Sequence, residues 1–224
     1  MCRALSILLL ACCVAGCMES GDPPANERRP LFGRTEVEVP PESDRGFIAG
    51  ERIGLITPGM PVATVEHLYG SGSIKAMDIP AGEGTTVPGY VLLPGTHDEL
   101  FIELGPDKQP QRARFHNPRS NWHDAATGLT IGTEFHELRE MNGESFDFTG
   151  FGWDYGGTVI DWNGGELEDL IVRLTYAPER LSGGGLPDSL LGDRRLSSDS
   201  AAVQALGLRV REILVPIRGE EEVK

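Results

Sequence analysis

Histidines and carboxylates are the first residues to consider, because a metal site or an acid–base pair needs them at defined spacings. His116 and His123 stand seven residues apart in a loop that contains Pro118, and Asp124 follows the second histidine. A metal could bind there, but solvated loop histidines are far more common than metal ligands. Residues 97–99, His-Asp-Glu, are typical of an exposed turn.

The signatures of common catalytic sites do not occur in the required contexts. No two histidines have the helical spacing of a zinc site, and no nucleophilic serine turn follows a strand. No phosphate-binding loop or dinucleotide-binding turn is found in the right setting. We therefore assign no catalytic residue, no metal ligand and no cofactor, and we expect that the protein is not an enzyme.

Aromatic residues indicate a different kind of chemistry, the recognition of another protein. Phe151, Trp153 and Tyr155 alternate along the chain, and Trp162 follows. If residues 151–155 are extended, the three alternating rings share one face of a sheet, because side chains alternate with a period of two. Rigid rings are common in binding hot spots because they lose little side-chain entropy. We predict a binding surface made of Phe151, Trp153, Asp154, Tyr155 and Trp162, with the alternative that these rings are core.

The first seventeen residues have the pattern of an export signal. Arg3 precedes an apolar run of about a dozen residues, which is too short to span a bilayer and has the length of a secretory signal. Val14-Ala15-Gly16-Cys17 resembles the lipobox of bacterial lipoproteins. The resemblance implies a signal peptide over 1–16, cleavage before Cys17 and a diacylglycerol on its thiol. An ordinary signal peptide with an incidental cysteine is the alternative.

The cysteine positions agree with this interpretation. The other three cysteines lie at positions 2, 12 and 13, so processing would leave no free thiol in the mature chain. That excludes disulfides, cysteine–zinc sites and cysteine nucleophiles in the mature protein. Met18, rather than the Asp typical of inner-membrane retention, follows Cys17. We expect a lipid-anchored envelope protein at the periplasmic face of the outer membrane.

Composition limits the partners and the fold. The formal net charge is −14 and the pI is about 4.7, so nucleic acid is not an expected partner. The chain holds 29 glycines and 16 prolines, which favours short strands and turns over a helical bundle. The proline-rich segment 17–46 is predicted to be a flexible tether that follows the lipidated cysteine.

Two segments of the body, 56–70 and 129–143, align without gaps and each predicts a short helix. Apolar residues recur at every third position, at Val62, Val65 and Leu68 in the first segment, and at Phe135, Leu138 and Met141 in the second. Thr133 is a plausible N-cap for the second helix. Gly70 and Gly143 suit the left-handed position that ends a helix.

Strand patterns repeat in the same way. Residues 100–104 and 170–174 are both predicted strands, and Asn163-Gly164 indicates a hairpin turn. We predict an α+β fold with two tandem modules, 47–123 and 124–178, each a short helix on a small antiparallel sheet. A C-terminal extension over 179–224 adds a loop, a short helix and an edge strand that ends near Pro216. The alternative is one irregular α+β domain with two unrelated helices.

A family resemblance rests on the first helix and the second module. Gly59-Met60 before a helix that ends in Leu68-Tyr69-Gly70 resembles the SmpA/OmlA outer-membrane-assembly lipoproteins and the tandem modules of β-lactamase inhibitor protein. Residues 128–157 look like a group of uncharacterised bacterial envelope proteins. The resemblance covers roughly residues 50–176 and implies helix-on-sheet modules that bind proteins through the sheet. It implies no catalytic residues, and the second module and the extension depart from the single-module lipoproteins.

These observations together predict a non-catalytic envelope protein that binds another protein or envelope component through an aromatic sheet face. Two alternatives stay open. The chain could inhibit a periplasmic or extracellular enzyme, by analogy with the inhibitor modules. It could also be an envelope hydrolase, which would need a pocket where carboxylates or histidines converge with perturbed pKa values.

Overall fold

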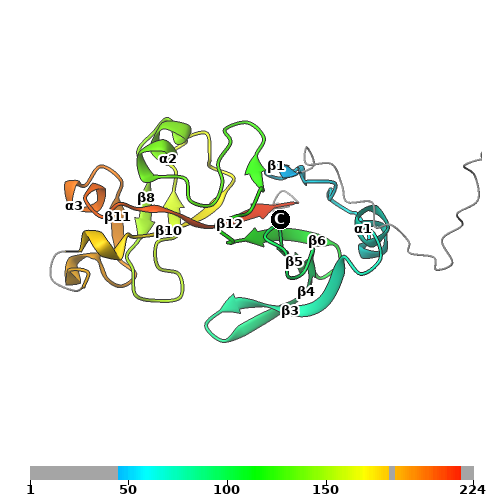
Figure 1. Cartoon of the computed structure of the whole chain (residues 1–224). Helices are drawn as coiled ribbons and strands as arrows, with labels where there is room; N and C mark the ends of the chain where they lie inside the picture. The colour runs from blue at the N-terminus through cyan, green and yellow to red at the C-terminus, as the bar shows by residue number, and fades with distance from the viewer. Residues whose placement is uncertain (1–44, 182–184, 218–224) are drawn as a thin grey trace, which may run out of the picture. The chain divides into compact units, whose positions relative to one another are not determined.

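The computed structural model describes residues 45–181 and 185–217 (Figure 1). The predicted signal peptide, the lipidation site Cys17 and most of the predicted tether lie outside the described residues. The described part has the predicted α+β class, with mostly antiparallel strands and three short α-helices. The elements are β1 Gly46–Ile48, β2 Arg52–Ile53, α1 Val62–Tyr69, β3 Ile74–Gly82, β4 Thr85–Leu92, β5 Leu100–Leu104, β6 Pro110–Phe115, β7 His123–Asp124, α2 Phe135–Asn142, β8 Asp147–Thr149, β9 Val159–Asp161, β10 Ile171–Thr175, η2 Pro178–Arg180, η3 Asp188–Leu190, β11 Arg195–Ser197, α3 Ala201–Gln204 and β12 Arg209–Pro216.

A six-stranded sheet dominates the fold, with strand order β10-β12-β6-β5-β4-β3. β12 comes last in the chain but lies inside the sheet, between β10 and β6, with antiparallel partners on both sides. The prediction that this strand lies at a sheet edge is therefore wrong. Pro216 is tolerated because it is the last residue of the strand, where it lies opposite Arg112. Its carbonyl accepts a hydrogen bond from the Gly50 N–H at 2.7 Å.

Two smaller sheets complete the fold. β1 pairs with β2 and, in parallel, with β7, so the start of the described chain lies beside residues 123–124. β8 lies between β9 and β11 in a second three-stranded sheet. The large sheet itself combines strands from both predicted modules and from the C-terminal extension. β3 to β6 come from the first module, β10 from the second and β12 from the extension.

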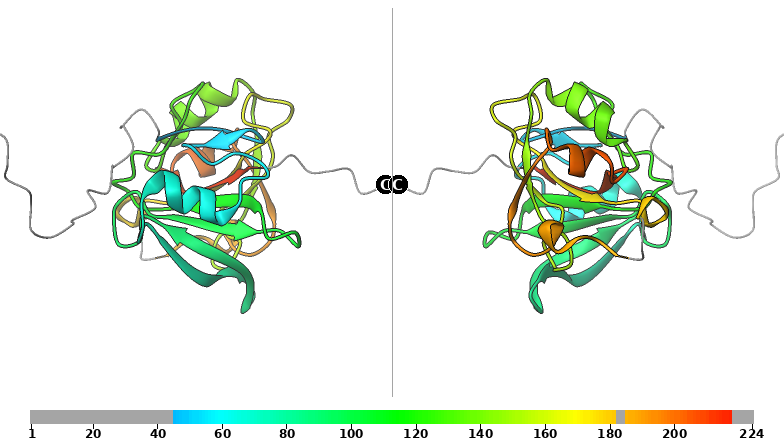
Figure 2. Two further views of the ribbon diagram at one scale, coloured as in Figure 1. Left: turned by 90° about the vertical axis from the view of Figure 1, so that its right-hand side faces the viewer. Right: turned by 90° about the vertical axis from the view of Figure 1, so that its left-hand side faces the viewer.

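The two faces of the large sheet carry different kinds of side chain. Alternate residues on one face belong to the central hydrophobic cluster, and Figure 2 shows α1 and α2 on the same side of the sheet. These core-facing residues are Tyr90, Leu92, Leu100, Ile102, Ala113, Phe115, Val172, Ile213 and Val215. Ile79, Val91 and Leu214 on the other face are buried but lie outside that cluster. The other face also carries charged side chains, such as Arg114 and Glu212, which are each 13% exposed.

Both predicted helices exist, but their buried faces differ from the simple every-third-residue pattern. α2 buries Phe135 and Leu138 as expected. α1 buries Val65 and Tyr69, which are four residues apart, whereas 39% of the surface of Leu68 is exposed. The i, i+4 spacing therefore defines the face of α1, because it follows the helical period more closely than a step of three. No helix among the described residues is long and apolar enough to cross a membrane.

Helix ends and turns correct three further expectations. Glu134, not Thr133, is the N-cap of α2, and it forms a capping box with Glu137. Gly143 adopts the left-handed conformation as predicted, whereas Gly70 has φ +90° and ψ 155°. Asn163 and Gly164 have the positive φ expected of them, but the turn does not join paired strands. β9 pairs with β8, and β10 pairs with β12.

Candidate functional site

The segment that carries the predicted aromatic surface is a loop and not a strand. Gly156 N–H donates to the Trp153 carbonyl at 3.0 Å, and Thr158 N–H donates to the Tyr155 carbonyl at 3.2 Å, so the chain turns between them. Gly152 and Gly157 have φ of +88° and +78°, a conformation that side chains disfavour. A Cβ at Gly157 would also collide with the carbonyl of Leu174. The glycines therefore allow the chain to turn here, and the backbone is not extended as the alternating pattern indicated.

Two of the predicted contact residues lie in the core. Phe151 is 4% exposed and packs edge-on against Tyr176, with ring centroids 5.3 Å apart. Trp162 is also 4% exposed, and its indole N–H donates to the Leu170 carbonyl at 2.8 Å. The expectation of one exposed aromatic row is wrong for these two rings, because both are covered by the second half of the body.

The other three predicted residues stand together at the surface. Trp153 is 37% exposed, and its indole N–H is fixed by the Gly150 carbonyl at 3.0 Å. The rings of Trp153 and Tyr155 meet edge to face with centroids 5.3 Å apart. Asp154 accepts a hydrogen bond from the Glu83 N–H at 3.0 Å. We call Trp153, Asp154 and Tyr155 the aromatic tip.

The β3–β4 turn supports the aromatic tip from a distant part of the sequence. A Cβ placed on Gly82, which has φ +97°, would lie 2.5 Å from the Tyr155 hydroxyl. The contact between Asp154 and the Glu83 N–H joins the same two segments. The β3–β4 turn therefore contacts the aromatic tip at two points, the Tyr155 hydroxyl and the Asp154 carboxylate.

Tyr155 connects the aromatic tip with a charged region on the face of the large sheet that lies opposite the central hydrophobic cluster. The Arg173 guanidinium lies 5.6 Å from the centre of the Tyr155 ring and donates to Glu212 at 2.8 Å. Arg114 pairs with the same carboxylate at 3.5 Å, and its guanidinium lies over the Phe101 ring. We call this region the arginine face: Arg112, Arg114, Arg173 and Arg211, together with Glu103 and Glu212.

The arginine face was missed in the sequence, although a signal for it is present. Arg112, Arg114 and His116 alternate with Ala113 and Phe115. This is the period-two pattern of a strand with one polar and one buried face. The structure buries Ala113 and Phe115 completely. The alternation covers only five residues and follows Pro110, so by itself it is a weak signal for a strand.

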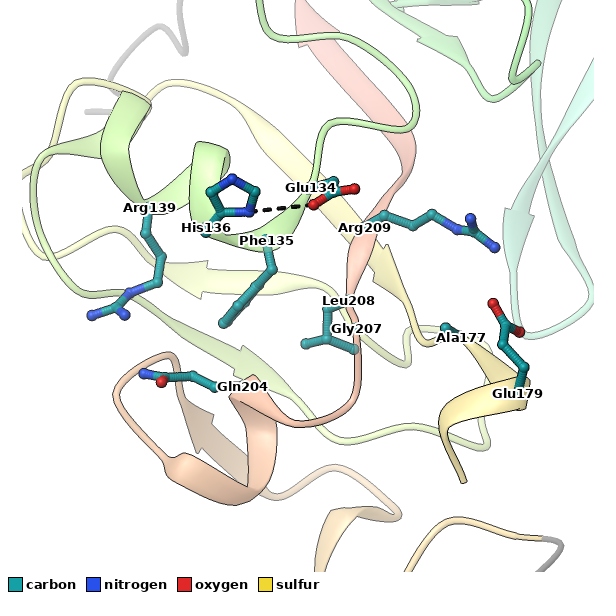
Figure 3. Close-up of a pocket in the computed structure, with 10 residues that line it drawn as sticks. All are labelled: Glu134, Phe135, His136, Arg139, Ala177, Glu179, Gln204, Gly207, Leu208 and Arg209. Carbon is teal, nitrogen blue, oxygen red and sulfur yellow. Dashed lines mark ion pairs between the residues drawn. The ribbon is translucent and has the colours of Figure 1, made fainter. Parts of the chain in front are cut away.

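A separate pocket of about 270 Å³ lies between the start of α2 and the segment that leads into β12 (Figure 3). Figure 3 shows Arg139 and Arg209 pointing to opposite sides, with the Glu179 carboxylate turned toward Arg209. The lining has no hydroxyl or thiol nucleophile, and its one ion pair joins the exposed Glu134 and His136 at 3.4 Å. The pocket therefore lacks the arrangement of nucleophile and base that acyl transfer requires.

The histidines that were considered for metal binding each have other neighbours. His116 stacks on Phe101 with centroids 5.5 Å apart, and His123 Nδ1 lies 2.9 Å from the Asn121 carbonyl. Asp124 accepts hydrogen bonds from Thr127. Within residues 45–181 and 185–217, no three His, Cys, Asp or Glu side chains are grouped so that they could hold a metal ion.

Asp98 departs from the predicted exposed turn, since it is 6% exposed. Its carboxylate accepts hydrogen bonds from Arg45 Nε at 2.8 Å and from the Asn121 N–H at 2.8 Å. Burial alone would raise the pKa of Asp98, but the hydrogen bonds from Arg45 and Asn121 outweigh it and hold the pKa below its usual value. Trp122 donates to the Asp98 carbonyl and lies under the Arg45 guanidinium. This network joins three segments and is structural.

No protein-family model, curated protein or solved structure matches the chain.

Proposed function

We propose that the protein is a lipid-anchored, non-catalytic component of the bacterial envelope that binds another protein through the aromatic tip. The observation that supports this proposal best is the exposed indole of Trp153, held rigidly by Gly150 and Tyr155. Binding to a rigid aromatic ring costs little conformational entropy, and such rings dominate measured hot spots. Phe151 and Trp162 take no part in the proposed surface, because they are buried.

The anchor rests on the sequence around Cys17. We propose that residues 1–16 are removed, that the Cys17 thiol carries diacylglycerol, and that residues 17–46 separate the body from the lipid. The apolar run before the cysteine and the small residues Ala15 and Gly16 support this proposal. The location that follows is the periplasmic face of the outer membrane.

We also propose that the body consists of two helix–strand units, 47–123 and 124–178, as in the families that it resembles. In each unit an eight-residue helix is followed by antiparallel strands. In this chain the two units and the extension 179–224 are fused through the large sheet, in which β12 pairs with both β6 and β10. The aromatic tip comes from the second unit and rests on the β3–β4 turn of the first.

Site-directed photo-crosslinking in cells tests the binding surface. A photoreactive amino acid at position 153 is compared with one at position 68, since Leu68 is 39% exposed and Trp153 is 37% exposed. The proposal predicts a discrete crosslinked product from position 153 that position 68 does not give. Products that are the same from both positions would contradict it.

The anchor has its own test. Cys17→Ser should abolish the lipid, because the thiol that carries it is absent. Mass spectrometry of the mature N-terminus identifies the modification directly. A mature parent chain without a lipid on Cys17 would contradict the proposed anchor, but it would not contradict the proposal for the aromatic tip.

A further inference from the structure

The arginine face has unused hydrogen-bonding capacity. Arg112 lies 3.6 Å from Glu103, and Arg114 lies 3.5 Å from Glu212, both beyond the usual range for a charged hydrogen bond. Within the described part of the chain, neither guanidinium donates a hydrogen bond to another group. Each guanidinium carries five N–H donors, so both arginines can bind an anion without giving up an existing hydrogen bond.

The face also carries more positive than negative charge. Glu212 is shared by Arg114 and Arg173, and Arg211 reaches the Gly156 carbonyl rather than a carboxylate. The Nε of Arg173 is buried and has no acceptor. The whole chain has a net charge of −14, so a cluster with four arginines and two glutamates departs from its surroundings. A local surplus of this sign favours an anionic group from a partner.

The spacing of the basic residues indicates the shape of that partner. Arg112 and Arg114 project from the same side of β6, with side chains 36% and 13% exposed. His116 continues the row just after the strand ends. Alternate residues on a strand are about 7 Å apart. An extended polypeptide with acidic residues at every second position repeats its carboxylates at the same distance.

We propose that the arginine face binds an acidic, extended segment of the partner protein, with alternate carboxylates placed on Arg112 and Arg114. The inference rests on the proposed function and specifies which kind of segment of the partner would bind. Phe101 contacts both Arg114 and His116, so its ring forms part of the same surface. The Arg173–Tyr155 contact makes the face continuous with the aromatic tip, so one partner can cover both.

Fluorescence anisotropy with two labelled peptides of identical composition tests this proposal on the full chain. In one peptide glutamate and threonine alternate, and in the other the glutamates are contiguous. The alternating peptide should bind more tightly. The double variant Arg112→Gln with Arg114→Gln should weaken its binding about tenfold. The control Lys108→Gln with Arg119→Gln removes the same charge from exposed positions and should change the affinity less than about twofold.

A thermal melt of each variant establishes that the body is folded. Side-chain Nε–H resonances of Arg112 and Arg114, followed by NMR during the titration, place the peptide on the face. Equal binding of the two peptides, or an equal loss in the control variant, would overturn the inference. So would a phosphate monoester that competes more strongly than the alternating peptide, since it would indicate a different anion. A specific crosslinked product from position 153 would still support the proposed function if the peptide failed.

Discussion

Replacing Asp98 by asparagine should destabilise the body strongly, although the side chain keeps its size. The carboxylate is 6% exposed and is the only carboxylate within 4.0 Å of Arg45 in the described part of the chain. Arg45 is 7% exposed, and its Nη1 is already without an acceptor. The substitution would leave a buried cation without a counter-charge, which costs about 3–5 kcal/mol. For a body of this size that loss lowers the Tm by roughly 10 °C.

Calorimetry or chemical denaturation of the full chain measures the effect. Asp78→Asn is the matched control, because Asp78 is exposed on β3 and the chemical change is the same. The control should change the free energy of unfolding by less than about 0.5 kcal/mol. Adding Arg45→Met to Asp98→Asn should restore part of the loss, since no buried charge then remains. A loss below about 1 kcal/mol in Asp98→Asn would refute the role of this ion pair.

Three further predictions concern pH, a buried amide and the aromatic tip. The pKa of Asp98 is lowered in the folded state, so its contribution to stability should be complete above the pKa that the residue has in the unfolded chain. This contribution should vanish as the pH falls through the pKa of the folded state. The free energy of unfolding of Asp98→Asn, measured by denaturation at several pH values, should therefore fall less steeply with decreasing pH than that of the parent. Asn142→Leu should cost about 2–4 kcal/mol in denaturation, because the Trp162 carbonyl and the Leu167 N–H lose their buried partner. Gly82→Ala should displace Tyr155 and change the near-UV circular dichroism, whereas Gly84→Ala, with open space around its Cβ, should leave that spectrum unchanged.

Local periodicity predicted the helices and the strands β5, β10 and β12, because short-range physics decides them. α2 begins one residue after its capping glutamate and ends at Gly143, which adopts the expected left-handed conformation. β5 covers residues 100–104 as predicted, and β10 is shifted by one residue. The α+β class follows directly from such elements. Their partners do not, because strand pairing depends on contacts between residues far apart in the chain.

The position of β12 shows this limit most clearly. Pro216 indicated an edge strand, but pairing with β6 and β10 on both sides decides the place of the strand. The aromatic segment shows a second limit, since the alternation of Phe151, Trp153 and Tyr155 implies a shared face only if the backbone is extended. Gly152 and Gly157 turn the chain instead, which buries Phe151 and leaves Trp153 exposed.

The most direct measurement of the central claim is the affinity of the partner captured at position 153 for the parent protein, Trp153→Ala and Leu68→Ala. Both variants shorten an exposed apolar side chain of similar fractional exposure. Loss of a hot-spot tryptophan costs about 2 kcal/mol or more, so Trp153→Ala should bind at least roughly thirtyfold more weakly while Leu68→Ala binds like the parent. Equal affinities for all three folded proteins would contradict the aromatic tip as the binding surface.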